Sequence, residues 1–196
     1  MAGAEASRVG RRLPDPGPPQ ARTVLLLVDV INPLDFPGAE ALTEAALVAA
    51  PRIAALKHEM ARRGVPVIYA NDNFGHWRSD FHQIVQRCRR GRRAAAALVR
   101  QLAPGLQDLT VLKPRYSAFD QTPLELLLTR IGADRLVVAG FATDLCVQFS
   151  AMDAFVRGYE LWVPGDCAAA EAPERHAAAL DWMALALRCR VQPAWR

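Results

Sequence analysis

The sequence has no hydrophobic run long enough to cross a membrane, and it has almost no lysine. A helical membrane span needs about 18 or more apolar residues in a row, and none occurs among the 196 residues. No apolar segment follows the basic N-terminal residues as a secretory signal would require, so we expect a cytoplasmic protein. Lysine occurs only at Lys57 and Lys113, and arginine supplies the other 22 of the 24 cationic side chains.

Paired cysteines and glycine-rich nucleotide motifs are also absent. The four cysteines, Cys88, Cys146, Cys167 and Cys189, are widely spaced with no Cys-x-x-Cys pair. This spacing argues against a zinc knuckle, a redox dithiol or a disulfide framework. No Gly-x-Gly-x-x-Gly motif occurs, so no feature favours a dinucleotide. We therefore expect free thiols and no cofactor.

Positive charge is concentrated in two segments and is not spread over the chain. The net charge is +4, and the excess of arginine lies in residues 1–22 and in residues 87–93. Neither segment interleaves aromatic residues with its arginines, so a solvated tail and a solvated helix end are favoured over a nucleic-acid surface. We expect a small-molecule substrate as partner, with no nucleic acid and no membrane.

Strand and helix patterns alternate after an N-terminal segment that has neither. Residues 1–21 hold four prolines and no apolar periodicity, which predicts a disordered tail. Apolar runs predict buried strands at residues 23–30, 65–70, 109–112, 136–139, 159–163 and 188–192. Helical patterns fill the segments between, one of them restarting at Pro51. The alternation predicts one domain over residues 22–196, a doubly wound, mostly parallel α/β sheet of six strands with helices on both faces.

Three reactive residues stand at the ends of three different predicted strands. Asp29 interrupts the first near its C-terminal end, Lys113 follows the third, and Cys146 lies in the first turn of the helix after residues 136–139. Because the carboxyl ends of parallel strands meet at one edge of a sheet, we expect these side chains to lie together. A helix N-terminus and a nearby cation favour the thiolate of Cys146, and Asp29 can accept its proton. Considered one at a time, Asp29 would be a carboxylate that caps a loop, Lys113 a solvated residue at a strand end, and Cys146 a thiol of the core. One shared site accounts for all three.

Three segments of the chain resemble a known family. They are Leu26, Val28 and Asp29 with Asn32, then KPRYSAF at residues 113–119, then GFATDLCV at residues 140–147. In this order they resemble the isochorismatase-like cysteine hydrolases, which include isochorismatases, nicotinamidases and N-carbamoyl amide hydrolases. The resemblance extends from about residue 23 to residue 192. It implies a Rossmann-like hydrolase fold and a homo-oligomer, either a dimer or a tetramer.

The resemblance also implies roles for the three reactive residues. Cys146 would be the nucleophile, Asp29 the general base and then acid, and Lys113 the electrostatic partner of a Cys-Asp-Lys catalytic triad. It further implies a non-proline cis peptide between Ala142 and Thr143. That turn would aim backbone N–H groups, including that of Cys146, at a developing oxyanion.

The loop after the second strand departs from the pattern of the metal-dependent nicotinamidases. Those enzymes carry Asp-x-His and a further His there, whereas this chain has Asp72, Asn73 and Phe74, with Phe74 at the first His position. His76 and His82 are displaced, so the ligand set is poor and we expect no metal. The substrate pocket is instead expected to be lined by amide and aromatic side chains. The candidates are Asn71, Asn73, Phe74 and Trp77, together with Phe36 and Tyr116.

These features favour hydrolysis of a C–N bond in a small amide or ureido compound through a thioester on Cys146. Two alternatives stay open. One is vinyl-ether hydrolysis of the isochorismatase type, for which the cysteine need not be present. The other is a catalytically idle oligomeric binding module of the same fold, and Lys113 argues against it because a chain so poor in lysine has kept one at this position.

Overall fold

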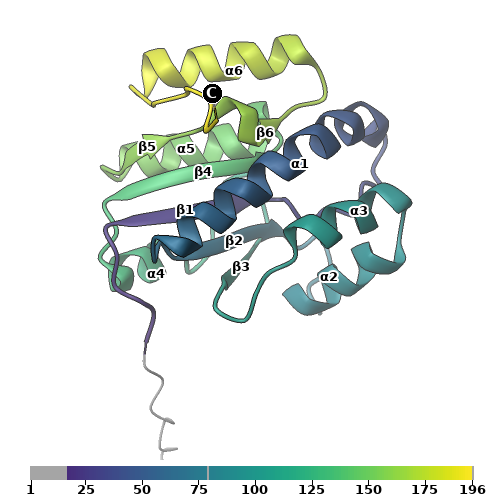
Figure 1. Cartoon of the computed structure of the whole chain (residues 1–196), viewed down its shortest axis with the longest axis horizontal. Coiled ribbons are helices and arrows are strands. Elements are labelled where there is room, and N and C mark those ends of the chain that lie inside the picture. The colour runs from purple at the N-terminus through teal and green to yellow at the C-terminus, as the bar shows by residue number, and fades with distance from the viewer. Residues whose placement is uncertain (1–16, 79, 196) are drawn as a thin grey trace, which may run out of the picture.

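The computed structural model describes residues 17–78 and 80–195 (Figure 1). The expected tail therefore falls mainly outside the described residues. Within them the chain is already attached before the first strand, because the Ala21 N–H donates to the Ile131 carbonyl at 3.0 Å. No helix among the described residues is long and apolar enough to cross a bilayer.

The elements alternate between strand and helix along the chain. In order they are β1 (Thr23–Val28), α1 (Ala39–Arg62), β2 (Val67–Asp72), α2 (Phe81–Arg90), α3 (Arg93–Leu102), β3 (Leu109–Lys113), α4 (Leu124–Ile131), β4 (Arg135–Phe141), the π-helical segment η1 (Thr143–Val147), α5 (Gln148–Val156), β5 (Glu160–Trp162), the 3-10 turn η2 (Gly165–Cys167), β6 (Ala168–Ala169) and α6 (Pro173–Ala186).

The strands form one parallel sheet in the order β3-β2-β1-β4-β5, with β6 also paired to β4. β5 pairs with residues 135–137 and β6 with residues 140–141, so the two lie end to end along the same side of β4. The predicted doubly wound α/β sheet of six strands is confirmed.

The sixth strand, however, is not the one expected. It is Ala168–Ala169, in a segment predicted to be a loop. The expected strand at residues 188–192 is reduced to one bridge between Trp162 and Arg190. Arg188 has a left-handed backbone, with a φ of 50°, so the chain turns there and reaches the edge of β5 only at Arg190.

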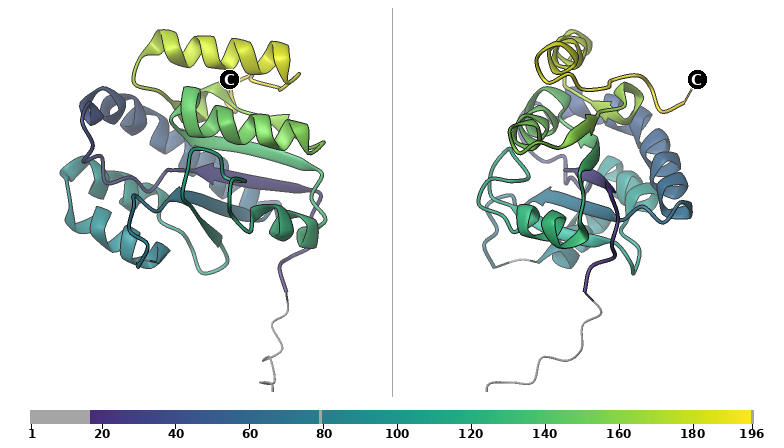
Figure 2. Two further views of the ribbon diagram at one scale, coloured as in Figure 1. Left: turned by 180° about the vertical axis from the view of Figure 1, so that it is seen from behind. Right: turned by 90° about the vertical axis from the view of Figure 1, so that its left-hand side faces the viewer.

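Helices cover both faces of the sheet, as Figures 1 and 2 show. On one face α1, α2 and α3 pack over Leu25, Leu27 and Tyr69. On the other, α4, α5 and α6 pack over Leu26 and Val28. Alternate residues of a strand point to opposite faces, so a strand buried on both faces must be apolar throughout, which accounts for the continuous run in β1.

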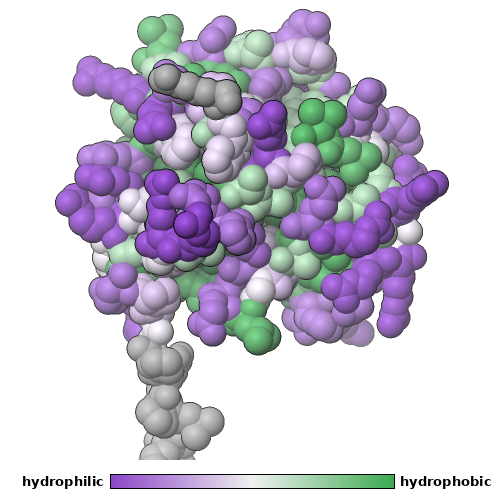
Figure 3. Space-filling view, in the orientation of Figure 1, coloured by the Kyte–Doolittle hydropathy of each residue, from purple (hydrophilic) through white to green (hydrophobic). Residues whose placement is uncertain are grey.

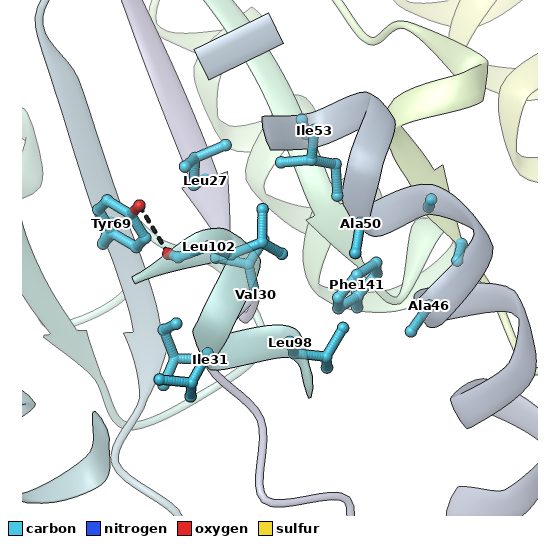
Figure 4. Packing of buried hydrophobic residues seen from close by; sticks show 14 of the residues in the cluster. Leu27, Val30, Ile31, Ala46, Ala50, Ile53, Tyr69, Leu98, Leu102 and Phe141 are labelled. Carbon is cyan, nitrogen blue, oxygen red and sulfur yellow. Dashed lines mark hydrogen bonds between the residues drawn. The ribbon is translucent and has the colours of Figure 1, made fainter. Parts of the chain in front are cut away.

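Helix α1 runs unbroken through Pro51, although a restart was predicted there. A proline inside a helix loses one backbone hydrogen bond and costs about 3 kcal/mol. Ala46, Ala50 and Ile53 lie on the buried side of α1 and are packed in the core that Figure 4 shows. Their burial offsets the cost, so packing keeps the helix continuous. Nearby, the Tyr69 hydroxyl donates to the Leu102 carbonyl at 2.8 Å (Figure 4).

The register of the sheet brings the carboxyl ends of four strands to one edge. Val28 stands beside both Ala70 and Gly140, and Asp72 stands beside Lys113. At Gly140 the φ is +130°, and a Cβ there would lie 1.9 Å from the Val28 carbonyl oxygen. Only glycine allows β1 and β4 to approach so closely at the edge where the candidate residues lie.

Candidate active site

The Lys113 side chain is fully buried at the end of β3 and joins the other two candidate residues. Its Nζ lies 2.8 Å from Asp29 Oδ2 and donates to Cys146 Sγ at 3.4 Å. It also donates to the Arg115 carbonyl at 3.0 Å, and Asp72 Oδ2 lies 3.6 Å away. An ammonium has three N–H groups, so each has a close partner. The three residues expected at one edge of the sheet are therefore in contact.

Asp29 directly follows β1 and is held from several sides. Its own N–H donates to the Ala70 carbonyl at 3.0 Å, and its Oδ1 accepts the Asp72 N–H at 2.6 Å. Its other oxygen faces Lys113, and its side chain is also hydrogen-bonded to Cys146. The residue is 5% exposed and has a φ of 52°. The carboxylate is thus fixed between a cation and a thiol.

Cys146 lies in η1, between the end of β4 and α5. It is half-buried, whereas Cys88, Cys167 and Cys189 are buried. The Ser150 hydroxyl donates to the Cys146 carbonyl at 2.6 Å and accepts the Ala118 N–H at 2.9 Å. Ser150 thereby links the cysteine turn to the segment that follows Lys113.

The three groups shift one another's pKa values. Burial raises the pKa of Asp29, and Lys113 opposes that shift. Burial lowers the pKa of Lys113, but the negative charges of Asp29 and Asp72 and the adjacent Cys146 together raise it above its ordinary value. Lys113 is therefore charged at neutral pH, and the buried carboxylate of Asp29 is a stronger base than a solvated one.

The expectation of a stabilised thiolate at Cys146 is wrong for the free enzyme. Burial raises the pKa of Cys146, the negative charge of Asp29 raises it further, and Lys113 lowers it by less than their sum. Lys113 contacts the sulfur directly, but its positive charge is already paired with the nearer Asp29 carboxylate. The resting residue is a thiol whose proton is hydrogen-bonded to the carboxylate.

The cis peptide lies one residue earlier than expected. It joins Phe141 to Ala142, and the expected position was between Ala142 and Thr143. The Ala142 carbonyl accepts the N–H groups of Leu145 and Val147, both at 3.1 Å. The peptide after Ala142 is thus already part of the helical hydrogen-bonding pattern, which uses trans peptides. Because the Leu145 N–H already donates to the Ala142 carbonyl, it is not available to donate a hydrogen bond to an oxyanion.

The two asparagines at the end of β2 are not equivalent. Asn71 is fully buried, and its amide accepts the Ile31 N–H at 3.1 Å and donates to the Ile31 carbonyl at 2.8 Å. It joins β2 to the chain after β1, so the expectation that it lines a substrate pocket is corrected. Asn73 is 8% exposed, and its Oδ1 accepts the Gly75 N–H at 2.9 Å, which shapes the loop.

The aromatic candidates lie in different places, and neither of the two cavities that they line includes Asp29, Lys113 or Cys146. Phe74 and Trp77 line a cavity of about 560 Å³ together with Arg87. Tyr116 lines a second cavity of about 420 Å³ and stacks on Phe149 with 5.5 Å between ring centroids. The fourth candidate, Phe36, is half-buried and packs against the core on the α1 face of the sheet, and its predicted contact with substrate stays a prediction.

The donor set does not fit a metal ion. His76 is hydrogen-bonded to Arg87, and His82 lies 3.3 Å from the Gln86 amide. Within residues 17–78 and 80–195 no three His, Cys, Asp or Glu side chains gather closely enough to bind one. Asp72 instead belongs to the polar network around Lys113 and Asp29, a role that its place at the end of a strand, like that of Asp29, could have indicated.

Comparisons with known proteins show which family the chain belongs to. A family model for the Isochorismatase domain matches residues 23–191. The chain is 35% identical over 164 residues to the uncharacterised isochorismatase family protein YaaI of Bacillus subtilis (strain 168), covering 84% of this chain and 90% of that protein. It is 42% identical over 85 residues to the ureidoacrylate amidohydrolase RutB of Methylobacterium radiotolerans, covering 43% of this chain and 33% of RutB.

Solved structures share the fold. An isochorismatase family protein from Desulfovibrio vulgaris is 26% identical, with a TM-score of 0.71 over 88% of this chain and 94% of that one. The N-carbamoylsarcosine amidase of Thermoplasma acidophilum has a TM-score of 0.66 at 24% identity, over 90% of this chain and 98% of that one. The matched segment includes every strand and all three residues of the site, and this chain belongs to the isochorismatase family of hydrolases.

Proposed function

We propose that this hydrolase cleaves the C–N bond of a small amide or ureido compound with Cys146 as nucleophile. The observation that carries the proposal is the contact of the Lys113 ammonium with both Asp29 and Cys146 in a buried setting. The similarity to RutB and to N-carbamoylsarcosine amidase, whose names give an amide-type substrate, supports the same class of bond.

In the first half of the reaction Sγ attacks the substrate carbonyl carbon while its proton passes to Asp29. Lys113 stabilises the negative charge that moves from the carboxylate to the sulfur. When the tetrahedral intermediate collapses, the C–N bond breaks and Asp29 returns the proton to the leaving nitrogen. An acyl or carbamoyl thioester remains on Cys146.

In the second half a water molecule attacks that thioester. Asp29, again a carboxylate, takes a proton from the water, the C–S bond breaks, and the proton restores the thiol of Cys146. Backbone N–H groups between Ala142 and Cys146, other than that of Leu145, are the proposed donors to the oxyanion in both halves. Phe74, Trp77 and Tyr116 are the proposed contacts of the substrate.

Mass spectrometry of the intact enzyme tests the thioester. A panel of small amides and N-carbamoyl compounds is incubated with wild type, Cys146→Ala, Cys146→Ser and, as a matched control, Cys88→Ala, which alters a buried cysteine away from the site. We expect turnover and an acyl adduct on wild type and Cys88→Ala, and neither on Cys146→Ala. Full amide turnover by Cys146→Ala would overturn the assignment of Cys146 as the nucleophile.

Vinyl-ether hydrolysis is the second candidate because an isochorismatase of Bacillus subtilis (strain 168) is 28% identical over 178 residues. Those residues are 88% of this chain but only 54% of that protein, so the chain spans about half its length. Turnover of isochorismate by both wild type and Cys146→Ala, with no amide cleaved, would favour this second candidate over the first.

A homo-oligomer is also proposed, and the outer face of α5 and α6 supports it. These helices lie side by side (Figure 2, left). Their exposed large hydrophobic residues are Phe149, Met152, Phe155 and Val156 on α5 and Trp182 and Leu185 on α6. Apolar surface gathered on neighbouring helices is typical of a protein interface. The cytoplasmic location stays a prediction.

A further inference from the structure

The first turn of α6 bonds to the segment that carries Cys146. His176 lies in that turn, and its Nδ1 is 2.8 Å from Thr143 Oγ1. The neighbouring Arg175 forms an ion pair with Asp144 at 2.5 Å. Thr143 and Asp144 are the first two residues of η1. Two side chains of α6 therefore hold the beginning of the cysteine turn.

The partners of His176 determine which ring nitrogen carries the proton. Besides contacting Thr143, the ring is hydrogen-bonded to the main chain of Gly165, and a main chain accepts only through its carbonyl oxygen. With Nε2–H donated to Gly165, Nδ1 keeps a lone pair and accepts the Thr143 hydroxyl proton. Thr143 is fully buried, so its hydroxyl has no solvent to replace this acceptor.

Charged groups from the neighbouring elements line the cavity beside the imidazole. His176 is in the wall of a cavity of about 830 Å³ formed by α1, η2, β6 and α6. The charged residues of that wall are Glu44, Arg52, Asp166 and Glu171, while Asp144 faces the ring from η1 and Arg175 adjoins it on α6. Hydrophobic residues gather over the N-terminal half of α1, which forms one side of the cavity (Figure 3). Burial lowers the pKa of His176 by more than Asp144 and Gly165 raise it, so the ring is neutral at neutral pH.

We propose that His176 is a positioning residue: its neutral ring fixes the Cys146 turn by accepting the Thr143 hydrogen bond, and protonation of the ring loosens that turn. The proposal rests on the proposed function only for its effect on turnover. A proton on Nδ1 turns the acceptor into a donor, so the buried hydroxyl must reverse and its own proton loses its partner. The residues that move are those that carry Sγ and the proposed oxyanion donors.

Two pairs of variants separate this role from simple packing. Thr143→Val removes the hydroxyl at nearly constant volume, and Thr143→Ser keeps it. His176→Ala removes the acceptor, while His176→Asn places an amide oxygen near the position of Nδ1 but cannot titrate. His58→Asn, on the exposed side of α1, is the matched histidine control.

Amide hydrogen exchange tests whether the Thr143–His176 hydrogen bond holds the Cys146 turn, and it needs no substrate. The probe is the Val147 N–H, which donates to the Ala142 carbonyl across the turn. We expect Thr143→Val and His176→Ala to lower its protection about tenfold or more at neutral pH, and Thr143→Ser, His176→Asn and His58→Asn to leave it within about threefold. Because the pKa of His176 lies below its ordinary value of 6.5, wild type should lose protection as the pH falls below that value, after correction for the intrinsic rate, and His176→Asn should not.

Turnover is the second readout. Because the turn carries reacting groups and not the substrate pocket, His176→Ala should lower kcat about ten- to hundredfold with little change in KM. Thr143→Val combined with His176→Ala should cost little more than either alone, since both break one bond. Three results would each overturn the proposal. The first is that the losses of kcat in the two single variants add up in the double variant. The others are unchanged exchange in Thr143→Val and His176→Ala, and a His176→Asn variant as impaired as His176→Ala. Turnover by Cys146→Ala would overturn the proposed function while the exchange result stands on its own.

Discussion

Lys113 Nζ and Cys146 Sγ lie 3.4 Å apart, although 33 residues separate them in the chain. The same ammonium lies 2.8 Å from Asp29, at the end of a third strand. A single buried cation thus contacts both the carboxylate and the thiol and lowers the pKa of each. The behaviour of these three residues can be tested one substitution at a time.

Lys113→Met should abolish most activity and lower stability. Removing one partner of a buried ion pair costs about 3–5 kcal/mol, and loss of one preorganised charge at a reacting group lowers kcat about a hundred- to thousandfold. The chain's other lysine provides the control. Lys57 also forms an ion pair, 2.6 Å from Asp108, so Lys57→Met should lose stability in urea unfolding while keeping kcat. Equal activity of the two variants would contradict the role of Lys113.

Asp29→Asn should lower the pKa of Cys146. In wild type the negative charge of Asp29 raises the thiol pKa, whereas Lys113 lowers it. The amide removes the first effect and leaves the second, so the thiolate forms at a lower pH than in wild type. The measurement is the pH dependence of iodoacetamide alkylation of Cys146, read by peptide mass spectrometry.

The buried Cys88, whose pKa is raised to about 11, serves as internal control because its alkylation should not change. Activity should be lost at every pH, since the proton acceptor is gone. If the inflection for Cys146 stays in place or moves upward in Asp29→Asn, the carboxylate does not act on the sulfur.

Asn71→Ala should destabilise the fold more than Asn73→Ala. The first leaves the buried N–H and carbonyl of Ile31 without their partner, at about 1–3 kcal/mol for each group. The second removes one loop hydrogen bond to Gly75, worth about 1 kcal/mol. Urea unfolding of both variants measures the difference. Equal losses would mean that Asn71 is not a structural clamp.

Gly140→Ala should prevent folding or cost more than about 4 kcal/mol, because its methyl group would lie 1.9 Å from the Val28 carbonyl oxygen. Gly132→Ala is the matched control. Gly132 also has a positive φ, +77°, but of residues 17–78 and 80–195 only the Gln20 side chain lies near it, at 3.5 Å, so the left-handed backbone alone costs about 1–2 kcal/mol. Thermal unfolding of both proteins separates the clash from the backbone preference.

Val156→Asp and Leu185→Asp should shift the proposed oligomer toward monomer. The two side chains are 79% and 85% exposed, so a charge there does not disturb the core of one chain but is costly inside an interface. Sedimentation velocity at several protein concentrations measures the state of each. Leu126→Asp, an exposed residue of α4, should leave it unchanged. An oligomer that survives both substitutions would locate the interface elsewhere.

The parallel sheet and the meeting of Asp29, Lys113 and Cys146 could be predicted because apolar runs mark buried strands and strand ends share one edge. The positions of the side chains that surround these three residues could not be predicted from the sequence. Asn71 and Asn73 are two residues apart in the same loop-strand junction, yet one is fully inside the fold and the other shapes the loop. That difference depends on where the chain after β1 passes, which no local pattern encodes.

The charge state of Cys146 was beyond sequence reasoning for a similar reason. A helix N-terminus and a lysine both favour the thiolate, but burial and Asp29 oppose them, and the sum depends on depth and distance. His176 gave no signal at all, since a histidine in a helix more than 25 residues after Cys146 has no spacing that points to Thr143. The β6 strand was missed because two paired residues are too few to show a period.

The fixed register of the sheet has a consequence for how such an enzyme can change its substrate. Asp29, Asp72 and Lys113 are set by ladder pairing, through Val28 with Ala70 and Asp72 with Lys113. The loops that carry the proposed substrate contacts begin only after those pairs. Insertions or exchanges at residues 74–78 therefore leave the strand ends in place, so the proposed substrate contacts can change while the proposed reacting groups stay where the sheet puts them.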